Sequence, residues 1–328
     1  MSRALSVHQG KGATPAEAQL GALLEGVESH AAETFFAQGL CCPFEQLPED
    51  QRAPALADFA ADRDRPPPGD EAVEWIEAED WFAGRPLYLP FDLVSLDFTC
   101  NIPSLFDRTS NGLATGATRD EAIAVALQEL IERDAVTEWK ESDLLEVMES
   151  TLDPRTISFD WFHLWRERVE AAGATILCYY VPSVTGSPVF ACEINDLRKD
   201  GRAYRAIQGR GCHPNPEIAL FKAVAEAIQG RAAYISGARD DLLPSDYTGA
   251  EKAVTIAFGL PLPPSMDGVD INSVASGPTG SVELADALRR AGYGRIGMVD
   301  LANPSGFTVV RAFVCGLGSI TRRRRPPS

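Results

Sequence analysis

The stretch ATRDEAIAVALQELIE, residues 117–132, decides how the rest of the chain is interpreted. Its side chains are small or apolar on nearly every side of a helix, yet Glu129 and Glu132 lie one turn apart near its end. Residues at positions i and i+3 share one helix face, with about 5–6 Å between their Cβ atoms. A helix of this composition is expected to be buried, where an uncompensated carboxylate is costly or stays protonated. The two acids therefore need a cation.

Two other segments of the chain repeat this pattern. Helix N-caps are predicted at Thr14, Thr118 and Asn215, each after a glycine-rich segment. The threonines are followed three residues later by Glu17 and Glu121, which indicates capping boxes, whereas a proline follows the asparagine, as is common at the first helical position. Eleven residues after each cap comes an acid, with a second polar side chain three residues later; these pairs are Glu25 and Glu28, Glu129 and Glu132, and Glu226 and Gln229.

The spacing from cap to acid places the acids far from the helix N-terminus. Eleven residues of α-helix rise about 16 Å, so the helix dipole does not stabilise these charges. If the three helices converge, their carboxylates form a cluster that only cations hold ionised, and hard oxygen ligands suit Mg²⁺ with phosphate in its remaining positions. The predicted metal ligands are Glu25, Glu28, Glu129, Glu132 and Glu226.

Two other interpretations of the repeat remain open at this point. Glutamates three residues apart on a helix are commonly part of a solvated face. Duplication of a purely structural helix would also produce the repeat, and Glu129→Gln would then raise stability rather than remove nucleotide affinity.

Composition and charge indicate a soluble globular protein and exclude several classes. The 328 residues are 45% hydrophobic and 23% charged, and the formal net charge is -17. This charge disfavours nucleic-acid binding, and an anionic ligand needs local cations or a metal. The seven cysteines contain no C-x-x-C pair, no secretory signal is recognised, and no apolar run approaches the roughly 18 residues of a membrane span. A cytoplasmic protein with free thiols, without membrane or nucleic-acid contacts, is expected.

Strand-like and helical patterns follow one another without strict alternation, which predicts an α+β fold. Residues 43–80 are rich in proline and acids and are expected to form a surface insertion with one short helix. Residues 321–328 are expected to be a basic, disordered tail. The predicted strands are 87–98, 174–183, 188–194, 295–302 and 307–317, and the predicted helices outside the repeat are 158–173 and 281–294.

Several basic and amide side chains are candidates to contact an anionic ligand. Lys11 lies between two glycines that permit close backbone approach, Arg311 lies in a strand-like run, and Arg231 lies on the third repeated helix. Ser110 and Asn111 precede a glycine and would donate to a phosphate or a base; the alternative is a turn. The alternatives for the cations are a surface loop for Lys11 and an outward, solvated orientation for Arg311.

Other common functional motifs are absent from the sequence. No G-x-x-x-x-G-K-[ST], G-x-S-x-G or G-x-G-x-x-G pattern occurs, and the four histidines have no metal-ligand spacing. A P-loop, an α/β-hydrolase site, a Rossmann site and a zinc site are therefore not supported.

Three segments and one strand together resemble the YcaO family. They are LSVHQGKGATPAEAQLGALLEGVESHAAE at 5–33, SNGLATGATRDEAIAVALQELIERDA at 110–135, GRGCHPNPEIALFKAVAEAIQGR at 209–231, and a closing V-x-R-x-x-V-x-G-L at 309–317. The resemblance covers nearly the whole chain, so residues 1–328 are expected to form a single YcaO domain. It implies a YcaO-type fold in which the three repeated helices pack on mixed or antiparallel sheets around an ATP site.

The resemblance implies an ATP-dependent enzyme that acts on backbone amides of a ribosomally made precursor peptide. A nucleophile adds to the amide carbonyl, the oxyanion attacks the γ-phosphate of ATP, and phosphate departs to leave an azoline, a thioamide or an amidine, so no protein nucleophile is required. By position, the five glutamates would hold Mg²⁺ and phosphate. The supporting contacts implied by the resemblance are Lys11, Ser110, Asn111, Gln229, Arg231 and Arg311.

The chain departs from the family pattern at several places. Gly21 and Val125 stand where many relatives carry a serine, and the chain begins almost at its first motif. Its end, RRRRPPS, lacks the P-x-P-x-P tail common in azoline-forming members. The missing tail, together with the GCHPNPE sequence at 211–217 before the third helix, favours thioamide formation with a TfuA-like partner. The alternatives are azoline formation with an E1-like partner, or a non-catalytic scaffold that presents a peptide. A homodimer is one candidate for the oligomeric state, since dimers are the commonest soluble assembly.

Overall fold

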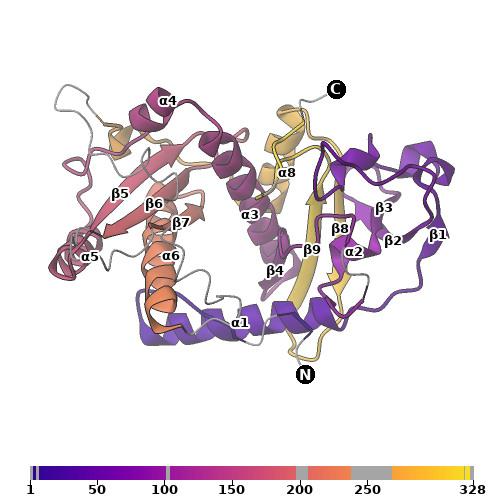
Figure 1. The fold of residues 1–328 in the computed structure, drawn as a ribbon, viewed down its shortest axis with the longest axis horizontal. Coiled ribbons are helices and arrows are strands. Elements are labelled where there is room, and N and C mark those ends of the chain that lie inside the picture. The colour runs from indigo at the N-terminus through magenta and orange to yellow at the C-terminus, as the bar shows by residue number, and fades with distance from the viewer. Residues whose placement is uncertain are drawn as a thin grey trace.

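Two antiparallel sheets form the framework of the part of the chain that the structure describes (Figure 1). The structure is a computed structural model, and it describes residues 3–4, 7–100, 104–196, 206–237, 268–320 and 322–325. The larger sheet has six strands in the order β1-β2-β8-β9-β4, with β3 also paired to β2, and the smaller sheet has three in the order β5-β6-β7. This mixture of helices with antiparallel sheets confirms the predicted α+β fold.

The six-stranded sheet carries an apolar core on each of its faces. Val310, Ala312 and Val314 pack with helices α3 and α8, whereas Val309 and Phe313 pack with the core formed by residues before α3. The alternation follows from the period of two along a strand. The bounds are β1 Leu40–Cys42, β2 Val73–Asp80, β3 Pro86–Pro90, β4 Leu113–Gly116, β8 Ile296–Leu301 and β9 Thr308–Val314, with α8 at Gly280–Arg290 and the short α2 at Phe91–Val94.

The three-stranded sheet is covered by helices on both faces. Its strands are β5 Ala174–Val181, β6 Val189–Asp196 and β7 Ile207–Cys212. Helices α5 (Asp160–Ala171) and α6 (Pro216–Ser236) share a core with one face, and α3 (Arg119–Lys140) shares a core with the other. Because α3 lies between the two sheets, 13 of its 22 residues are buried. The short α4 (Leu144–Glu149) follows α3.

The three repeated helices begin where their caps predict. The Thr14 side chain caps α1 (Pro15–Glu33) in a capping box, and Asn215 caps α6. Thr118 caps α3, but Glu121 accepts from the backbone N–H of Ala117 at 3.0 Å and not from the cap residue itself. The predicted capping box is therefore shifted by one residue in the second copy. The strands and helices predicted at 158–183, 188–194 and 281–317 are also present. The strand predicted at 87–98 is wrong beyond Pro90, where β3 ends and the short helix α2 begins.

Helix α1 is not buried as α3 and α6 are. Its buried residues are confined to its last turn, at Ala31, Ala32 and Glu33, while Leu20 and Leu23 are 50% and 68% exposed. Figure 1 shows α1 running along one side of the molecule from α6 toward β4, against which it packs. The expectation that each copy buries its sides therefore fails for α1, because α1 rests on the ends of the other elements.

The segment 43–80 is not a surface insertion. Its last part is strand β2, which pairs with β1, β3 and β8. Trp75 of β2 is fully buried, its ring contacts those of Phe44 and Phe59, and its indole N–H donates to Cys42 O at 2.8 Å. The sequence VEWIEAED does not look like a strand because its outward side chains are acids. In place of one short helix, the segment contains three 3₁₀ helices of three residues each. Strands β1, β4 and β7 were not predicted either, because β1 and β4 have three and four residues and β7 contains two glycines.

The basic C-terminal residues are not a disordered tail where the structure describes them. The arginines at 322–325 form ion pairs with buried or half-buried acids. The expectation for residues 321–328 was therefore wrong at 322–325, and the remaining residues of that range lie outside the described part of the chain. A run of arginines is typical of a solvated chain end only when the fold contains no buried acids with which the arginines can pair.

Two expectations from composition can be compared with the structure. Within the described residues, no helix is long and apolar enough to cross a bilayer. All seven cysteines are free, as predicted, and five of them are buried.

Candidate active site

Polar side chains from α1, α3 and α6 face a common region of the fold. Glu28 of α1 and Glu129 of α3 are close enough to repel each other, and Arg133 of α3 is attracted by acids of both α3 and α6. Lys11, which precedes α1, forms an ion pair with Glu226 of α6. Residues from three distant parts of the sequence thus lie near one another.

Glu28 links α1 to strand β4. Its Oε1 accepts a hydrogen bond from the backbone N–H of Thr115 at 2.8 Å. Burial, followed by repulsion from Glu129, raises the pKa of Glu28 to about 8, and Glu25 adds a smaller repulsion. Glu25 itself is exposed and accepts from the backbone N–H of Gln9 at 2.7 Å. Among the described residues, no cationic side chain forms an ion pair with Glu28.

Glu129 and Glu132 lie in the buried middle of α3. Burial raises the pKa of Glu129, repulsion from Glu132 adds to it, and the guanidinium groups of Arg133 and Arg311 oppose it. The Oε1 of Glu129 is 3.4 Å from Nη2 of Arg133, and the Glu129 side chain is 23% exposed. Glu132 is only 6% exposed. Glu132 is therefore buried, whereas Glu129 is half-buried and forms a weak ion pair with Arg133 on the next turn.

Glu226 has the opposite electrostatic environment. Burial alone would raise its pKa, but the charges of Lys11, Arg210 and Arg133 outweigh burial and lower the pKa. The Lys11 ammonium contacts Oε2, and Nε of Arg210 lies 3.5 Å from Oε1. Arg210 was missed by sequence reasoning, although its place between Gly209 and Gly211 in a short strand next to α6 was a detectable signal.

The glycines before each repeated helix serve helix packing. A Cβ on Gly10 would lie 1.8 Å from Ala18 O in α1, and one on Gly209 would lie 2.2 Å from Ala223 O in α6. A Cβ on Gly116 would lie 2.5 Å from the backbone nitrogen of Ala122 in α3. Glycine at these positions thus allows the backbone to pack closely against the helix that follows.

Two of the predicted contact residues carry unpaired buried atoms. Both side-chain amide atoms of Asn111, which is 7% exposed, have no hydrogen-bond partner among the described residues. Arg311 is 4% exposed; its Nη2 donates to Thr109 O at 2.5 Å, and its Nη1 is likewise unpaired in the described chain. Burial lowers the pKa of Arg311 to about 10. Buried donors without partners are expected to bind a polar ligand.

The other predicted contacts are placed differently. Arg231 faces Asp196 at 3.5 Å, so its charge is already matched by the end of β6. Gln229 is half-buried one turn beyond Glu226, and Ser110 is exposed beside Asn111. Their assignment as nucleotide contacts stays a prediction.

The residues in this region fit a Mg²⁺-bound triphosphate better than a bare metal ion. Among the described residues, no group of three or more His, Cys, Asp or Glu side chains is arranged to hold a metal on its own. Mg²⁺ usually takes one or two protein carboxylates and fills its octahedron with water and phosphate oxygens. The half-buried acids would supply carboxylates, and Lys11, Arg133 and Arg311 would supply cations for phosphate. The assignment of five glutamates as metal ligands stays a prediction.

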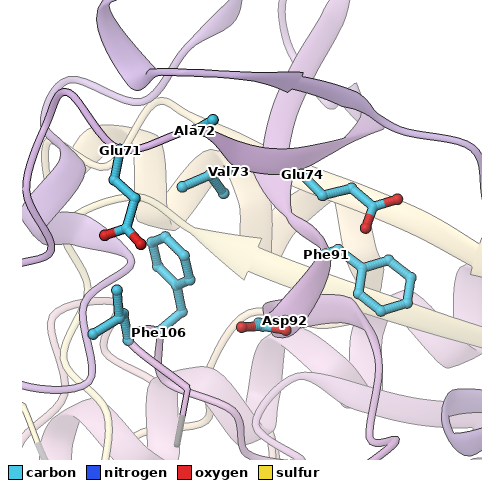
Figure 2. Close-up of a pocket in the computed structure, with 8 residues that line it drawn as sticks. Glu71, Ala72, Val73, Glu74, Phe91, Asp92 and Phe106 are labelled. Atoms are coloured by element: carbon cyan, nitrogen blue, oxygen red, sulfur yellow. The ribbon is translucent and has the colours of Figure 1, made fainter. Parts of the chain in front are cut away.

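A separate hollow lies on the other side of the larger sheet and contains none of these residues. Figure 2 shows Asp92 and Phe106 on one side of it, with Glu71 and Glu74 on the other. Asp92 is already paired with Arg108 and accepts from Ser104 Oγ at 2.8 Å. Its acids would repel a triphosphate, so it is not the candidate active site.

Comparison with known families decides the assignment. Residues 9–318 match the family model described as YcaO cyclodehydratase, ATP- and Mg²⁺-binding. The chain belongs to the YcaO family. ATP and Mg²⁺ are the cofactors of this family, as the acids and unpaired donors of the candidate site suggest. The resemblance noted in the sequence is thereby confirmed.

Similar proteins include two that match most of this YcaO chain. A protein in the tfuA 3′ region of Rhizobium leguminosarum bv. trifolii is 32% identical to this chain. The match covers 78% of this chain and 62% of the length of that relative. A protein of Methanothermobacter thermautotrophicus is 30% identical over 96% of the chain and 82% of its own length.

Solved structures share the fold. A heterocyclase in complex with substrate and cofactor matches with a TM-score of 0.77 and 22% identity, over 94% of this chain and 44% of that one. The YcaO protein of Methanopyrus kandleri, solved with AMPPCP and Mg²⁺, matches with a TM-score of 0.73 and 24% identity, over 98% and 83%. At this identity the likeness confirms the YcaO-type fold.

Proposed function

We propose that this protein uses ATP and Mg²⁺ to activate a backbone amide of a ribosomally synthesised precursor peptide, and that it forms a thioamide with a TfuA-like partner. The observation that carries the proposal is the meeting of acids from α1, α3 and α6 with the cations Lys11, Arg133 and Arg210. The relative in a tfuA 3′ region supports the choice of partner. We further propose that residues 1–328 work as a single domain.

The chain's own residues would position charge and would not attack the substrate. Bound ATP supplies a phosphoryl group that turns the amide oxygen into a leaving group. Glu28, Glu129 and Glu132 would hold Mg²⁺, with Glu25 and Glu226 completing the acidic side. The phosphates would be neutralised by Lys11 and Arg311, and the unpaired amide of Asn111 would orient them. Sulfide would add to the carbonyl, as charge neutralisation and positioning suffice for this reaction class.

Product analysis tests the proposal. The purified protein is incubated with a precursor peptide, sulfide and MgATP, with and without a TfuA-like protein. Replacement of one amide oxygen by sulfur, seen by mass spectrometry with release of ADP, is the expected result. Loss of one water with an E1-like protein, without need for sulfide, would instead establish an azoline-forming enzyme.

The second candidate function is a non-catalytic scaffold that presents a peptide to another enzyme. Calorimetric titration with MgATP separates the two, because a scaffold with a decayed site would not bind. The unpaired buried donors of Asn111 and Arg311 favour the enzyme, since leaving such groups unpaired without a ligand is costly. A homodimer is compatible with either function.

Lys11→Met is expected to weaken MgATP binding with little effect on folding. The side chains of Lys11 and Glu226 are 30% and 26% exposed, and Arg210 remains beside Glu226, so stability should change by less than about 1 kcal/mol. Loss of a charge-assisted contact to phosphate should raise the dissociation constant about tenfold. Titration calorimetry and thermal unfolding measure the two effects. Lys11→Arg should restore binding, and an unchanged affinity in Lys11→Met would contradict the assignment.

A further inference from the structure

The C-terminal segment, residues 316–320 and 322–325, holds the loop that leads to Asn111. Ser319 Oγ donates to Asp107 Oδ2 at 2.7 Å, and Nε of Arg322 lies 3.4 Å from the same oxygen. The side chains of Arg322 and Asp107 are 4% and 7% exposed. Asp107 is therefore fixed at the start of the short stretch that ends in Ser110 and Asn111.

The same segment holds helix α3 beside its acidic pair. Asp134 is fully buried and accepts from the backbone N–H of Gly318 at 2.8 Å, while Nη2 of Arg324 lies 3.1 Å from its other oxygen. Thr137 Oγ1 donates to Ser319 O at 2.6 Å. Asp134 directly follows Arg133, so this contact restrains the turn of α3 that carries Arg133.

A third set of contacts anchors the segment to the core on the far side of the sheet. Arg325 Nη2 lies 3.0 Å from Oδ2 of the fully buried Asp58, and Arg322 donates to Asp58 O. Arg63 donates to the carbonyl oxygens of Gly316 and Leu317 at 3.1 and 3.3 Å. The segment is thus anchored to the core at one side. At the other side it makes two sets of contacts near the candidate site, one to Asp107 and one to Asp134.

We propose that Arg322 and Arg324 are positioning residues for nucleotide binding: through Asp107 and Asp134 they set the relative placement of the Asn111 loop and α3. This rests on the proposed function. A stabilising role alone would not require both contacts to lie next to donors that have no partner in the described part of the chain, which are the amide of Asn111 and Nε of Arg133. Asp107 and Asp134 are buried, so removing the arginine from either pair leaves an uncompensated buried charge, and each pair therefore holds a defined geometry.

Arg324→Gln, with Arg323→Gln as the matched control, tests the inference. Both variants remove one charge at neighbouring positions, but the Arg323 side chain is 62% exposed and its ion-pair partner Glu138 keeps the backbone N–H of Arg324 at 2.8 Å. The dissociation constant for MgATP is measured well below the melting temperature of each variant. Arg324→Gln should raise it about tenfold, whereas Arg323→Gln should stay within about twofold of the wild type.

Further variants separate positioning from folding. Arg324→Lys keeps the charge next to Asp134 and should recover most of the affinity, and Ser319→Ala, which removes only the hydroxyl on Asp107, should weaken binding in the same direction. An affinity unchanged in Arg324→Gln and Ser319→Ala, or equal losses in Arg324→Gln and Arg323→Gln, would overturn the inference while leaving the proposed function intact. Failure of the wild type to bind MgATP would overturn both.

Discussion

Glu129→Gln is expected to abolish MgATP binding and, at the same time, to raise the melting temperature of the metal-free protein. Burial raises the pKa of Glu129 even with Arg133 and Arg311 nearby, so the ionised form is a net cost in the absence of a metal. A neutral amide of the same shape removes that cost. It also removes an oxygen charge that Mg²⁺ would need, and the affinity should fall at least about a hundredfold.

Scanning calorimetry with a chelator present should show that the melting temperature of Glu129→Gln rises by about 2–4 °C for each kcal/mol gained in the free energy of unfolding. Titration with MgATP then shows whether affinity is lost. The matched control is Glu167→Gln, because Glu167 is an exposed glutamate of α5 and should change neither quantity. A stabilised variant that still binds nucleotide would support a purely structural repeat, and a destabilised variant would contradict the electrostatic account of α3.

The second large effect is a pH dependence of stability that comes from Glu28. Its pKa is raised from 4.5 to about 8 in the folded, metal-free protein. Between these values the folded state keeps a proton that the unfolded state has released. The contribution of Glu28 is therefore fully present below pH 4.5 and is lost as pH rises through about 8. The free energy of unfolding changes with pH by at most about 1.4 kcal/mol per pH unit from this one group. The observed slope is expected to be smaller, because the Glu28 side chain is only half-buried.

Denaturant unfolding of the metal-free protein at several pH values measures this slope. The difference between wild type and Glu28→Gln isolates Glu28 from all other titrating groups, and it should grow with pH in favour of the variant and level off above about pH 8. Glu167→Gln should follow the wild type throughout. Parallel curves for wild type and Glu28→Gln would show that Glu28 ionises normally and faces water.

Parts of the fold that depend on local chemistry could be predicted from the sequence. The caps at Thr14, Thr118 and Asn215 satisfy backbone N–H groups within a few residues, so their side chains carry the signal by themselves. Strands β5 and β9 were predicted because β-branched and aromatic residues run continuously in them. Strand β2 was not, because its alternate acids match a charged loop in composition.

The candidate site was predicted only in part for a similar reason. The spacing of the acids in the three repeated helices identified which carboxylates to consider, and Glu28 and Glu129 are close enough to repel each other. Arg210 lies in β7, whose approach to α6 depends on glycines 209 and 211 fitting against the helix backbone. A contact between β7 and α6 that depends on tertiary packing produces no recognisable pattern in the sequence of either segment.

The sequence by itself determined the helix starts, the repeated acid spacing and the family, because these are set by neighbouring residues along one helix. Tertiary structure alone decided that α3 lies between two sheets while α1 stays exposed, that Arg231 pairs with Asp196, and that the C-terminal arginines pair with buried or half-buried acids. A buried charge must be neutralised by whatever opposite charge the fold brings within a few ångströms, and that partner is chosen by packing and not by position in the chain.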